Sequence, residues 1–352
     1  DTTRPVTAGC NEPSPDNHLF KSGAIDLIGF NYHHQWVKDV PRNFPGKPFI
    51  FSESVSALQT RGYYMMPSDS IFVAPKEWWL PYTDPTFMCS SYDNMHASWS
   101  STHEETWDVV KHTPYVGGQF IWTGFDYIGE PTPYGFPARS SYFGIIDLAG
   151  FPKDVYYMYQ SEWTTKPMLH LFPHWNWLPG QEIDLWCYYN QADEVELFVN
   201  GKSQGVKRKA DKGVEAGVTA YHVSWRVSFE PGEVRAVSRK DGRVVCEQTI
   251  RTASQPHHIR LTVDYAGRDL TFVNVDVVDK DGNLCPWADD QVFFSVDGDG
   301  RVVGTDNGCQ TSMERFTAPQ RKAFFGRCMA VVKGRGTLRA QGYGLGTATI
   351  DL

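Results

Sequence analysis

The pattern of apolar residues changes near residue 165, and this change constrains the fold of the 352-residue chain more than any other feature. Before it, short continuous apolar runs at 25–30, 48–51 and 116–122 suit strands that are buried on both faces of a parallel sheet. Between the second and third runs, apolar residues at helical spacing predict a helix within 90–112. The order strand, helix, strand predicts an α/β domain over residues 1–165.

After this point the sequence predicts strands and tight turns. Segments 184–189, 194–199 and 232–237 alternate apolar and polar residues, and Asn200-Gly201 and Asp241-Gly242 are dipeptides that favour hairpin turns. They predict a β-sandwich over 166–253. A linker at 252–256 precedes a second all-β domain over 254–352, whose strands we expect at 259–263, 270–278, 291–296, 324–332 and 336–340.

Composition excludes several classes of protein. The net charge of -8, without a basic stripe, argues against nucleic-acid binding, and no apolar run approaches the roughly 18 residues of a membrane span. The seven cysteines form no metal-binding pattern, and the adjacent His33 and His34 would point to opposite faces of a strand. We therefore expect no metal, no cofactor, no nucleic-acid partner and no membrane association.

Polar and aromatic side chains follow three successive predicted strands. The run KPFIFSE at 47–53 is a buried strand that ends in Glu53, and Asn31 and Tyr32 end the strand before it. Trp122 ends the strand after it, and Asp126 and Glu130 follow in the next loop. Because the carboxyl ends of barrel strands converge on the active site, these residues are the candidate functional set.

This set, in this order, resembles the C-terminal half of the catalytic barrel of glycoside hydrolase family 2, the family of β-galactosidases, β-glucuronidases and β-mannosidases. The resemblance covers essentially the whole chain. Segments 4–7, 26–32, 48–53 and 117–122 resemble the fifth to eighth barrel strands, 153–163 resembles the last helix, and 196–202, 306–308 and 321–324 resemble accessory domains. It implies a multidomain α/β plus all-β protein: the C-terminal half of a (β/α)8 TIM barrel followed by two immunoglobulin-like β-sandwiches.

The resemblance implies a retaining glycosidase, in which one carboxylate attacks the anomeric carbon and a second acts as acid and then as base. Glu53 matches the nucleophile, and Tyr32 matches the tyrosine that contacts it. Trp122 matches an aromatic residue that covers a sugar face. Asn31 and Asp126, with Glu130 beside them, are expected to bind sugar hydroxyls.

The family's acid/base is a Glu that follows an Asn at the end of the fourth strand. Asn11-Glu12 imitates this pair, but it follows the segment that matches the fifth strand and precedes Pro13. We therefore expect the acid/base upstream of residue 1, so that this chain is a fragment that is inactive in isolation. Because half a barrel exposes apolar edges, it should pair with a second copy or pack against the sandwiches.

Specificity is predicted from the loop at 138–145. This loop lacks the Asn-x-Lys pair with which β-glucuronidases hold a carboxylate, so we expect a β-galactosidase acting on a carbohydrate substrate. A β-glucuronidase remains an alternative, because Arg139 could bind a substrate carboxylate with two hydrogen bonds. A β-mannosidase is a further alternative. A non-catalytic carbohydrate-binding module would explain the aromatic residues, but not Glu53 beside Tyr32. The resemblance also implies a periplasmic or secreted protein.

The insert at 59–90 follows the strand that ends in Glu53, and we expect it to form a rim of the pocket. Its aromatic residues either stack on a leaving-group sugar or pack within the loop itself. They are Tyr63, Tyr64, Trp78, Trp79 and Tyr82.

Overall fold

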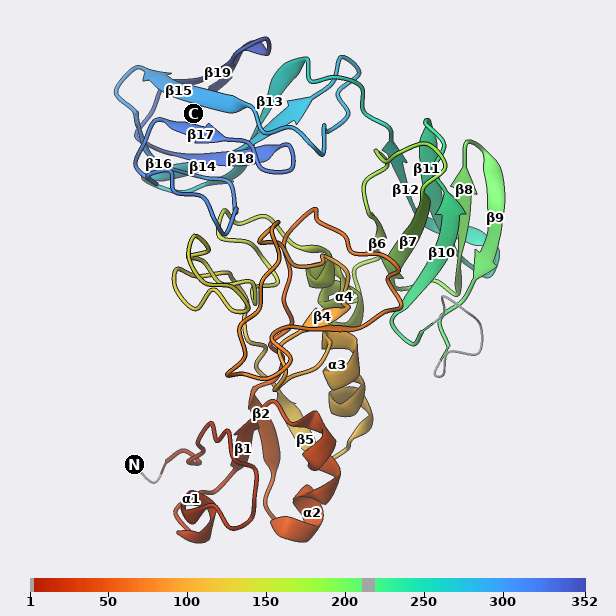
Figure 1. Cartoon of the computed structure of the whole chain (residues 1–352), viewed down its shortest axis with the longest axis vertical. Helices are drawn as coiled ribbons and strands as arrows, with labels where there is room; N and C mark the ends of the chain where they lie inside the picture. The colour runs from red at the N-terminus through yellow and green to blue at the C-terminus, as the bar shows by residue number, and fades with distance from the viewer. Residues whose placement is uncertain (1–2, 211–218) are drawn as a thin grey trace. The chain divides into compact units, whose positions relative to one another are not determined.

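The computed structural model describes residues 3–210 and 219–352, and the chain divides into two compact units, Asp1–Ile145 and Ile146–Leu352. The first unit contains a parallel sheet with the order β1-β2-β5, formed by Ile28–Asn31, Phe49–Glu53 and Val116–Gln119 (Figure 1). Cys10 adds a parallel bridge to Phe30 at the edge of β1. The three predicted strands are confirmed, although β5 ends three residues earlier than expected.

Helices precede or connect these strands. They are α1 (His18–Lys21), the 3-10 helix η1 (His34–Asp39), α2 (Val40–Asn43) and α3 (His103–His112). Of the helix predicted within 90–112, only the second half forms. The Asp93 carboxylate accepts hydrogen bonds from the backbone N–H groups of His103 and Glu104, and so caps the helix where it starts. The residues before it carry β4 (Met95–His96), which pairs with β3 (Phe72–Val73).

Phenylalanine rings form the centre of the first unit. Phe30, Phe49 and Phe51 are fully buried, and their ring centroids lie 4.5–6.0 Å apart. Val37 and Val40 belong to the same buried cluster, and Val109 and Val110 of α3 pack against it. Each buried aromatic side chain contributes about 2 kcal/mol of hydrophobic free energy, so this cluster holds the strand ends in register. Half of a TIM barrel is not evident from these strands alone.

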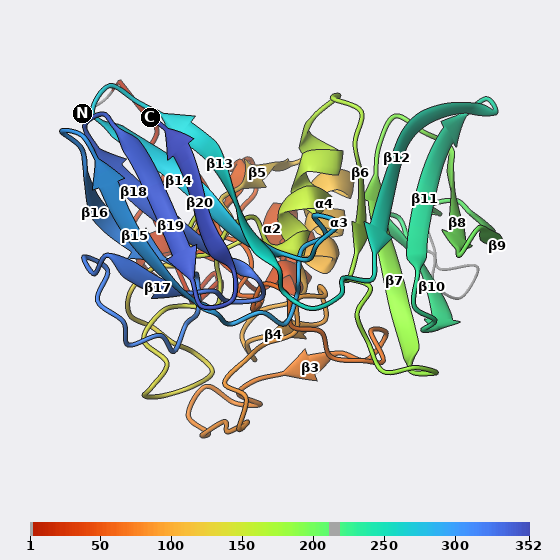
Figure 2. The same ribbon diagram turned by 90° about the horizontal axis from the view of Figure 1, so that it is seen from above.

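The second unit is mostly β-structure. After α4 (Asp154–Trp163), one sheet has the order β10-β7-β6, formed by His222–Ser228, Glu182–Tyr189 and Leu169–Phe172. The other has the order β12-β11-β8-β9, formed by Arg243–Arg251, Glu233–Lys240, Glu194–Val199 and Lys202–Lys207 (Figure 2). Asn200-Gly201 and Asp241-Gly242 have positive φ angles between paired strands, which confirms both predicted hairpin turns.

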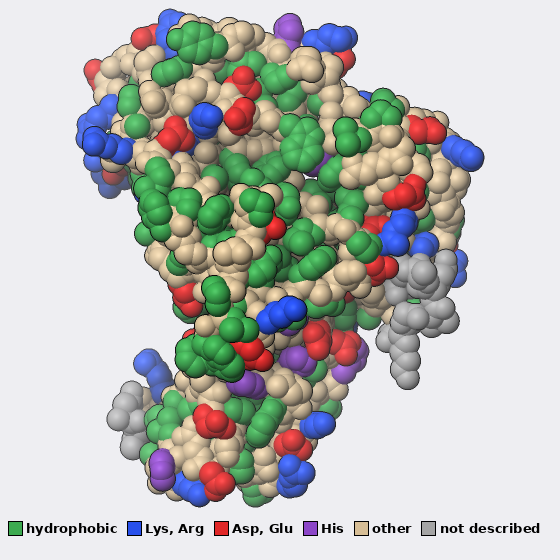
Figure 3. All heavy atoms as spheres, viewed as in Figure 1, with side chains coloured by type: hydrophobic (Ala, Val, Ile, Leu, Met, Phe, Trp, Pro, Cys, Tyr) green, Lys and Arg blue, Asp and Glu red, His purple; other side chains and the backbone are tan. Residues whose placement is uncertain are grey.

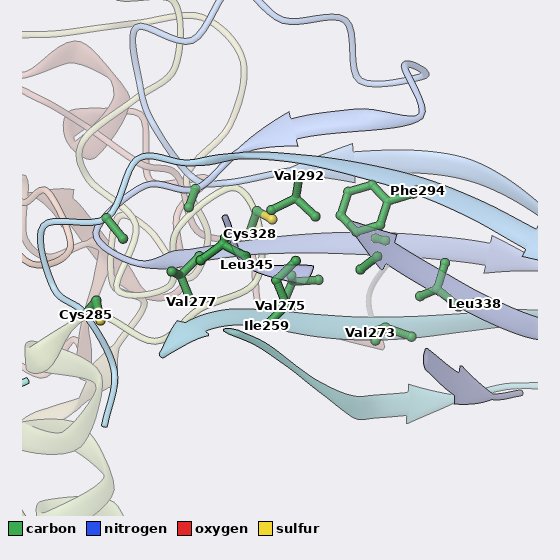
Figure 4. Packing of buried hydrophobic residues seen from close by; sticks show 14 of the residues in the cluster. Ile259, Val273, Val275, Val277, Cys285, Val292, Phe294, Cys328, Leu338 and Leu345 are labelled. Atoms are coloured by element: carbon green, nitrogen blue, oxygen red, sulfur yellow. The ribbon is translucent and has the colours of Figure 1, made fainter. Parts of the chain in front are cut away.

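The last part of the chain forms two four-stranded sheets. One has the order β13-β14-β18-β16: His258–Ala266, Leu270–Val278, Arg327–Lys333 and Arg301–Asp306. The other has the order β17-β15-β19-β20: Gln320–Lys322, Gln291–Asp297, Thr337–Gly342 and Gly346–Asp351. Figure 4 shows buried side chains from both, among them Val275, Phe294 and Leu338, packed against one another. This is a sandwich-like arrangement, and β16, β17 and β20 were not predicted.

Charged side chains are dispersed over the face that Figure 3 draws. On this face, acidic and basic side chains lie scattered among neutral ones.

Among the described residues, no helix combines the length and the apolar character needed to cross a membrane. All seven cysteines lie in the described part of the chain, and each is a free thiol. The predicted domain limit at 165 stays a prediction; the division into compact units falls between Ile145 and Ile146, before α4.

Asp279 ties the linker at 252–256 to the last sandwich. Its carboxylate accepts hydrogen bonds from the backbone N–H groups of Ser254, Asp281 and Asn283 and from the Asn283 side chain. Burial alone raises the pKa of the Asp279 carboxyl group, but these hydrogen bonds outweigh it and bring the pKa to about 2. The folded protein therefore favours the charged form of this group.

Replacing Asp279 by Asn tests this arrangement. Because the pKa is lower in the folded chain than in the unfolded chain, the stabilisation is present above about pH 4 and is lost as pH falls toward 2. We expect Asp279→Asn to lower the free energy of unfolding of the second unit by about 2 kcal/mol at pH 7, and by much less near pH 2. Denaturant titrations at both pH values measure this. The control is Asp281→Asn, which removes an exposed carboxylate in the same turn; an equal loss there would contradict the assignment.

Candidate active site

The ends of β1 and β2 place the candidate catalytic residues together. Asn31 is the register partner of Glu53, and the pairing shifts by one residue after Phe30. The backbone N–H of Tyr32 donates to the carbonyl oxygen of Glu53 at 2.6 Å. Tyr32 has a positive φ of 52°, which turns the chain away from the sheet at this point. The main chain alone therefore sets Tyr32 beside Glu53.

The two side chains are also joined. The Tyr32 hydroxyl donates a hydrogen bond of 2.6 Å to Oε2 of Glu53. Burial, and then this bond to a carboxylate, raise the pKa of Tyr32 above its ordinary value, so the phenol stays protonated and keeps donating. Within the described part of the chain, no other hydrogen bond to the Glu53 carboxylate is found. A carboxylate with one oxygen held and the other available suits a nucleophile.

The Asn31 side chain connects the ends of the neighbouring strands through hydrogen bonds. It is buried, its amide nitrogen donates to Oδ1 of Asn11 at 2.8 Å, and its Oδ1 accepts from the Ser52 hydroxyl at 2.8 Å. Both ends of the amide are thus bonded to protein. Gly9 lies against it, since a Cβ there would be 3.1 Å from Asn31 Oδ1. A direct contact of Asn31 with a sugar stays a prediction.

Trp122 belongs to a second group of residues in the same unit. It is half-buried and packs edge-to-face on Tyr127, with ring centroids 5.7 Å apart. The Tyr127 hydroxyl donates to the Glu130 carboxylate, and burial together with this bond raises the pKa of Tyr127. The charge of Glu130 also contributes to the raised pKa of Tyr32. The backbone N–H of Ser54, next to Glu53, donates to the carbonyl oxygen of Phe120 at 2.9 Å, so the chain that leads to Trp122 runs beside the chain that follows Glu53.

Asp126 lies beneath this loop. Only 3% of it is exposed, and its Oδ1 accepts from the backbone N–H of Gly144 at 2.8 Å and from the Ser141 hydroxyl at 3.3 Å. The Ser141 oxygen in turn accepts from the backbone N–H of Tyr127. These bonds join the two sides of the loop that carries Trp122 and Glu130. The structure thus gives Asp126 a supporting position, and its predicted contact with a sugar hydroxyl stays a prediction.

Glu12 and the adjacent histidines His33 and His34 each make local contacts of their own. The exposed Glu12 carboxylate accepts from the backbone N–H of Ser14 at 2.9 Å, as in an ordinary turn. Burial lowers the pKa of His33, and the charge of Glu12 opposes this shift. His34 Nε2 lies 2.9 Å from Oε1 of Glu105. In residues 3–210 and 219–352, no group of three or more potential ligands is placed to hold a metal ion.

In the insert at 59–90 the aromatic residues pack on protein, Trp78 against Trp79 within the loop, and stacking on a leaving-group sugar stays a prediction. Tyr82 packs on Tyr134, with ring centroids 5.4 Å apart, and both belong with the buried cluster against which Trp122 rests. Trp78 and Trp79 are instead 71% and 62% exposed. The insert therefore supports the loop after β5 from within and presents two indole rings to solvent.

Three residues of this site were not predicted from the sequence. Asn11 and Ser52 bond the Asn31 amide, and Tyr127 connects Trp122 with Glu130. Ser52 and Tyr127 are sequence neighbours of predicted residues, which is the one signal that points to them. Asn11 was considered only as the residue before Glu12.

Substitution of Asn31 by Ala tests its supporting position. The change removes two side-chain hydrogen bonds and leaves polar groups of Asn11 and Ser52 without partners, so we expect a loss of about 2 kcal/mol in stability. Ser52→Ala removes one of the two bonds and should cost about 1 kcal/mol. Thermal unfolding followed by circular dichroism measures both. Equal unfolding temperatures for Asn31→Ala and wild type would contradict this account.

Comparisons with known proteins match both parts of the chain. A family model described as glycoside hydrolase family 2 C-terminal domain 5 matches residues 250–351, and a domain of unknown function matches residues 180–246. A β-galactosidase of Bacteroides ovatus is 59% identical over 362 residues, covering 100% of this chain and 42% of that protein. A putative β-glucuronidase of Formosa agariphila is 32% identical and covers 93% of this chain and 33% of its own length.

A solved structure shares the fold. The crystal structure of a β-glycosidase from Bacteroides vulgatus matches with a TM-score of 0.84 at 31% identity, covering 100% of this chain and 47% of that one. The chain thus spans less than half the length of each of these three relatives. The family 2 domain at 250–351 and the 59% identity across the whole of this chain show that it belongs to glycoside hydrolase family 2.

Proposed function

We propose that the protein is a retaining glycoside hydrolase that cleaves terminal β-galactosides, with Glu53 as its nucleophile. The observation that carries this proposal is the 2.6 Å hydrogen bond from Tyr32 to Glu53 at the ends of adjacent parallel strands. The choice of galactoside is supported by the 59% identity to the Bacteroides ovatus β-galactosidase.

In this reaction Glu53 attacks the anomeric carbon, and the bond to the leaving-group oxygen breaks as that oxygen receives a proton from an acid. Water then attacks the glycosyl ester, gives its proton to the same group acting as base, and releases Glu53. Tyr32, held protonated, donates to Oε2 and orients the carboxylate for attack. Trp122 offers an apolar ring face for the sugar. The acid/base is assigned to no described residue.

We also propose that β1, β2 and β5 are strands of a TIM barrel. All three are parallel, and the candidate residues follow their carboxyl ends, which is the catalytic end of such barrels. On this proposal the barrel portion is 1–165, and the sheets of 166–253 and 254–352 are two immunoglobulin-like sandwiches. The support is the parallel order of the three strands together with the two later pairs of sheets, of which the last shares one buried core.

Covalent labelling tests the nucleophile. The natural protein that contains this sequence is incubated with 2-deoxy-2-fluoro-β-galactosyl fluoride, and its peptides are analysed by mass spectrometry. Because fluoride leaves with little help from an acid, we expect a galactosyl adduct on Glu53. Glu53→Gln should abolish the adduct, and the matched change Glu12→Gln should leave it intact. An adduct on another carboxylate would show that Glu53 is not the nucleophile.

Tyr32→Phe tests the hydrogen bond itself. The variant keeps the ring and its burial but removes the hydroxyl that orients Glu53, so we expect the labelling rate to fall by roughly 10- to 100-fold. Tyr127→Phe is the matched control, because it removes a tyrosine hydroxyl that donates to Glu130 instead. If Tyr32→Phe is labelled as fast as wild type, the bond does not contribute to the reaction.

A β-glucuronidase is the second candidate. It is favoured by the relative named putative β-glucuronidase, at 32% identity, and by the position of Arg139, whose carbonyl oxygen accepts from Gly129 across the loop that follows Trp122. A guanidinium group binds a carboxylate with two parallel hydrogen bonds. Parallel assays with aryl β-galactoside and aryl β-glucuronide separate the candidates. We expect at least 100-fold faster cleavage of the galactoside; the reverse preference, lost in Arg139→Ala, would establish the glucuronidase.

A further inference from the structure

The outer face of the sheet β17-β15-β19-β20 carries a row of neutral side chains. Phe293 is the register partner of Gln320 on one side and of Gln341 on the other, and Gln341 is the partner of Thr347. Phe293 and Gln341 point away from the core, because their neighbours Val292, Phe294 and Ala340 are buried, and Gln320 and Thr347 are exposed in the same row. Partners in such a row lie about 5 Å apart, so the row crosses the whole sheet.

Two aromatic rings stand at this row. Phe293 is 40% exposed and Tyr343 is 87% exposed. Their ring centroids lie 6.2 Å apart and their planes are perpendicular, at 89°. Together with Gln341 and Gly342 they line a groove of about 280 Å³. One ring can therefore lie under a ligand while the other lies along its side.

The position of Tyr343 is fixed by the core. It lies in the tight turn between β19 and β20, where the backbone N–H of Leu345 donates to the carbonyl oxygen of Gly342. Leu345 is buried in the cluster shown in Figure 4, so the turn is anchored from inside. The backbone that carries the ring is therefore anchored, so a bound ligand has to order only the side-chain torsions of Tyr343.

The polar side chains of the row are available for hydrogen bonds to a ligand. Among the described residues, the side chains of Gln320, Gln341 and Thr347 make no hydrogen bond to the protein. Each primary amide offers both donors and an acceptor, and a hydroxyl offers both in one group. These are the groups that bind the hydroxyls of a sugar, which likewise donate and accept.

The charges near the row are neutralised. Arg339, in the next row of the same face, forms an ion pair with Asp297, and Lys322 lies 3.5 Å from Asp289. The groove is lined by Phe293, Gln341, Gly342 and Tyr343, and none of these described residues carries a charge. An anionic ligand would find no unpaired cation there, whereas a neutral pyranose, with an apolar ring face and polar edges, matches aromatic rings flanked by amides.

From this geometry we infer that the groove at Phe293 and Tyr343 is a non-catalytic binding site for a neutral polysaccharide. The site is independent of Glu53 and uses the exposed face of β15 and β19. One sugar residue lies on the face of one ring with the other ring along its edge, and its neighbours along the polysaccharide chain contact the row from Gln320 to Thr347. Such a site would hold the protein on a polymeric substrate.

Affinity gel electrophoresis tests this inference. The whole chain carries Glu53→Gln, so that polysaccharide in the gel is not hydrolysed, and it migrates through native gels containing β-1,4-galactan, galactomannan or polygalacturonate. We expect retardation by at least one of the two neutral polymers and none by the anionic polymer. Tyr343→Ala should weaken binding roughly tenfold and Gln341→Ala about threefold. The double change Phe293→Ala with Tyr343→Ala should abolish retardation.

A matched control separates the groove from exposed aromatic residues in general. Tyr265 is 61% exposed on β13 of the opposite sheet, so Tyr265→Ala should leave retardation unchanged. Circular dichroism confirms that each variant is folded. The inference is wrong if the folded chain is retarded by neither neutral polymer, or if Tyr343→Ala and Tyr265→Ala are retarded equally. It is also wrong if Phe293→Ala changes the oligomeric state in sedimentation, which would make this face a protein contact.

Discussion

The candidate site depends on the parallel pairing of β1 and β2. The main-chain bond from Tyr32 to the carbonyl oxygen of Glu53 and the side-chain bond from Tyr32 to its carboxylate both require these strands to end at the same level. That level is fixed by the buried rings of Phe30, Phe49 and Phe51, which cannot shift by one residue without leaving the core. The chemistry proposed for Glu53 therefore rests on aromatic packing several residues away.

A network of hydrogen bonds gives the rest of the site its shape. Asp126 is buried and joins both sides of the loop after β5, so it acts on Trp122 and Glu130 through the backbone. Asn31 has a similar position between Asn11 and Ser52. Buried, fully bonded groups of this kind orient their neighbours and resist displacement. Residues that resemble substrate ligands in the sequence are, in the structure, bonded to the protein.

The β-rich part of the chain was predicted well where local chemistry decides. The hairpins at Asn200-Gly201 and Asp241-Gly242 follow from residues that tolerate positive φ, and β14 has the bounds that its alternation predicts. Prediction failed where strands are short or polar. β17 contains only three residues, with the buried Arg321 at its centre. The Arg321 guanidinium donates to the carbonyl oxygens of Thr305 and Arg315, which belong to two other segments of the chain. No local sequence pattern predicts such a strand.

The sequence by itself determined the change from an α/β part to a β-rich part, the family resemblance and the candidacy of Glu53, Tyr32 and Trp122, because strand patterns and short motifs are local. Only the tertiary structure decided which polar groups point toward each other and which form hydrogen bonds within the protein. Asp126 and Glu130 lie four residues apart in one loop, yet one is buried beneath it and the other is exposed beside Tyr127. The pairing of Phe293 with Tyr343 likewise depends on strand register, which arises from contacts between residues far apart in the chain.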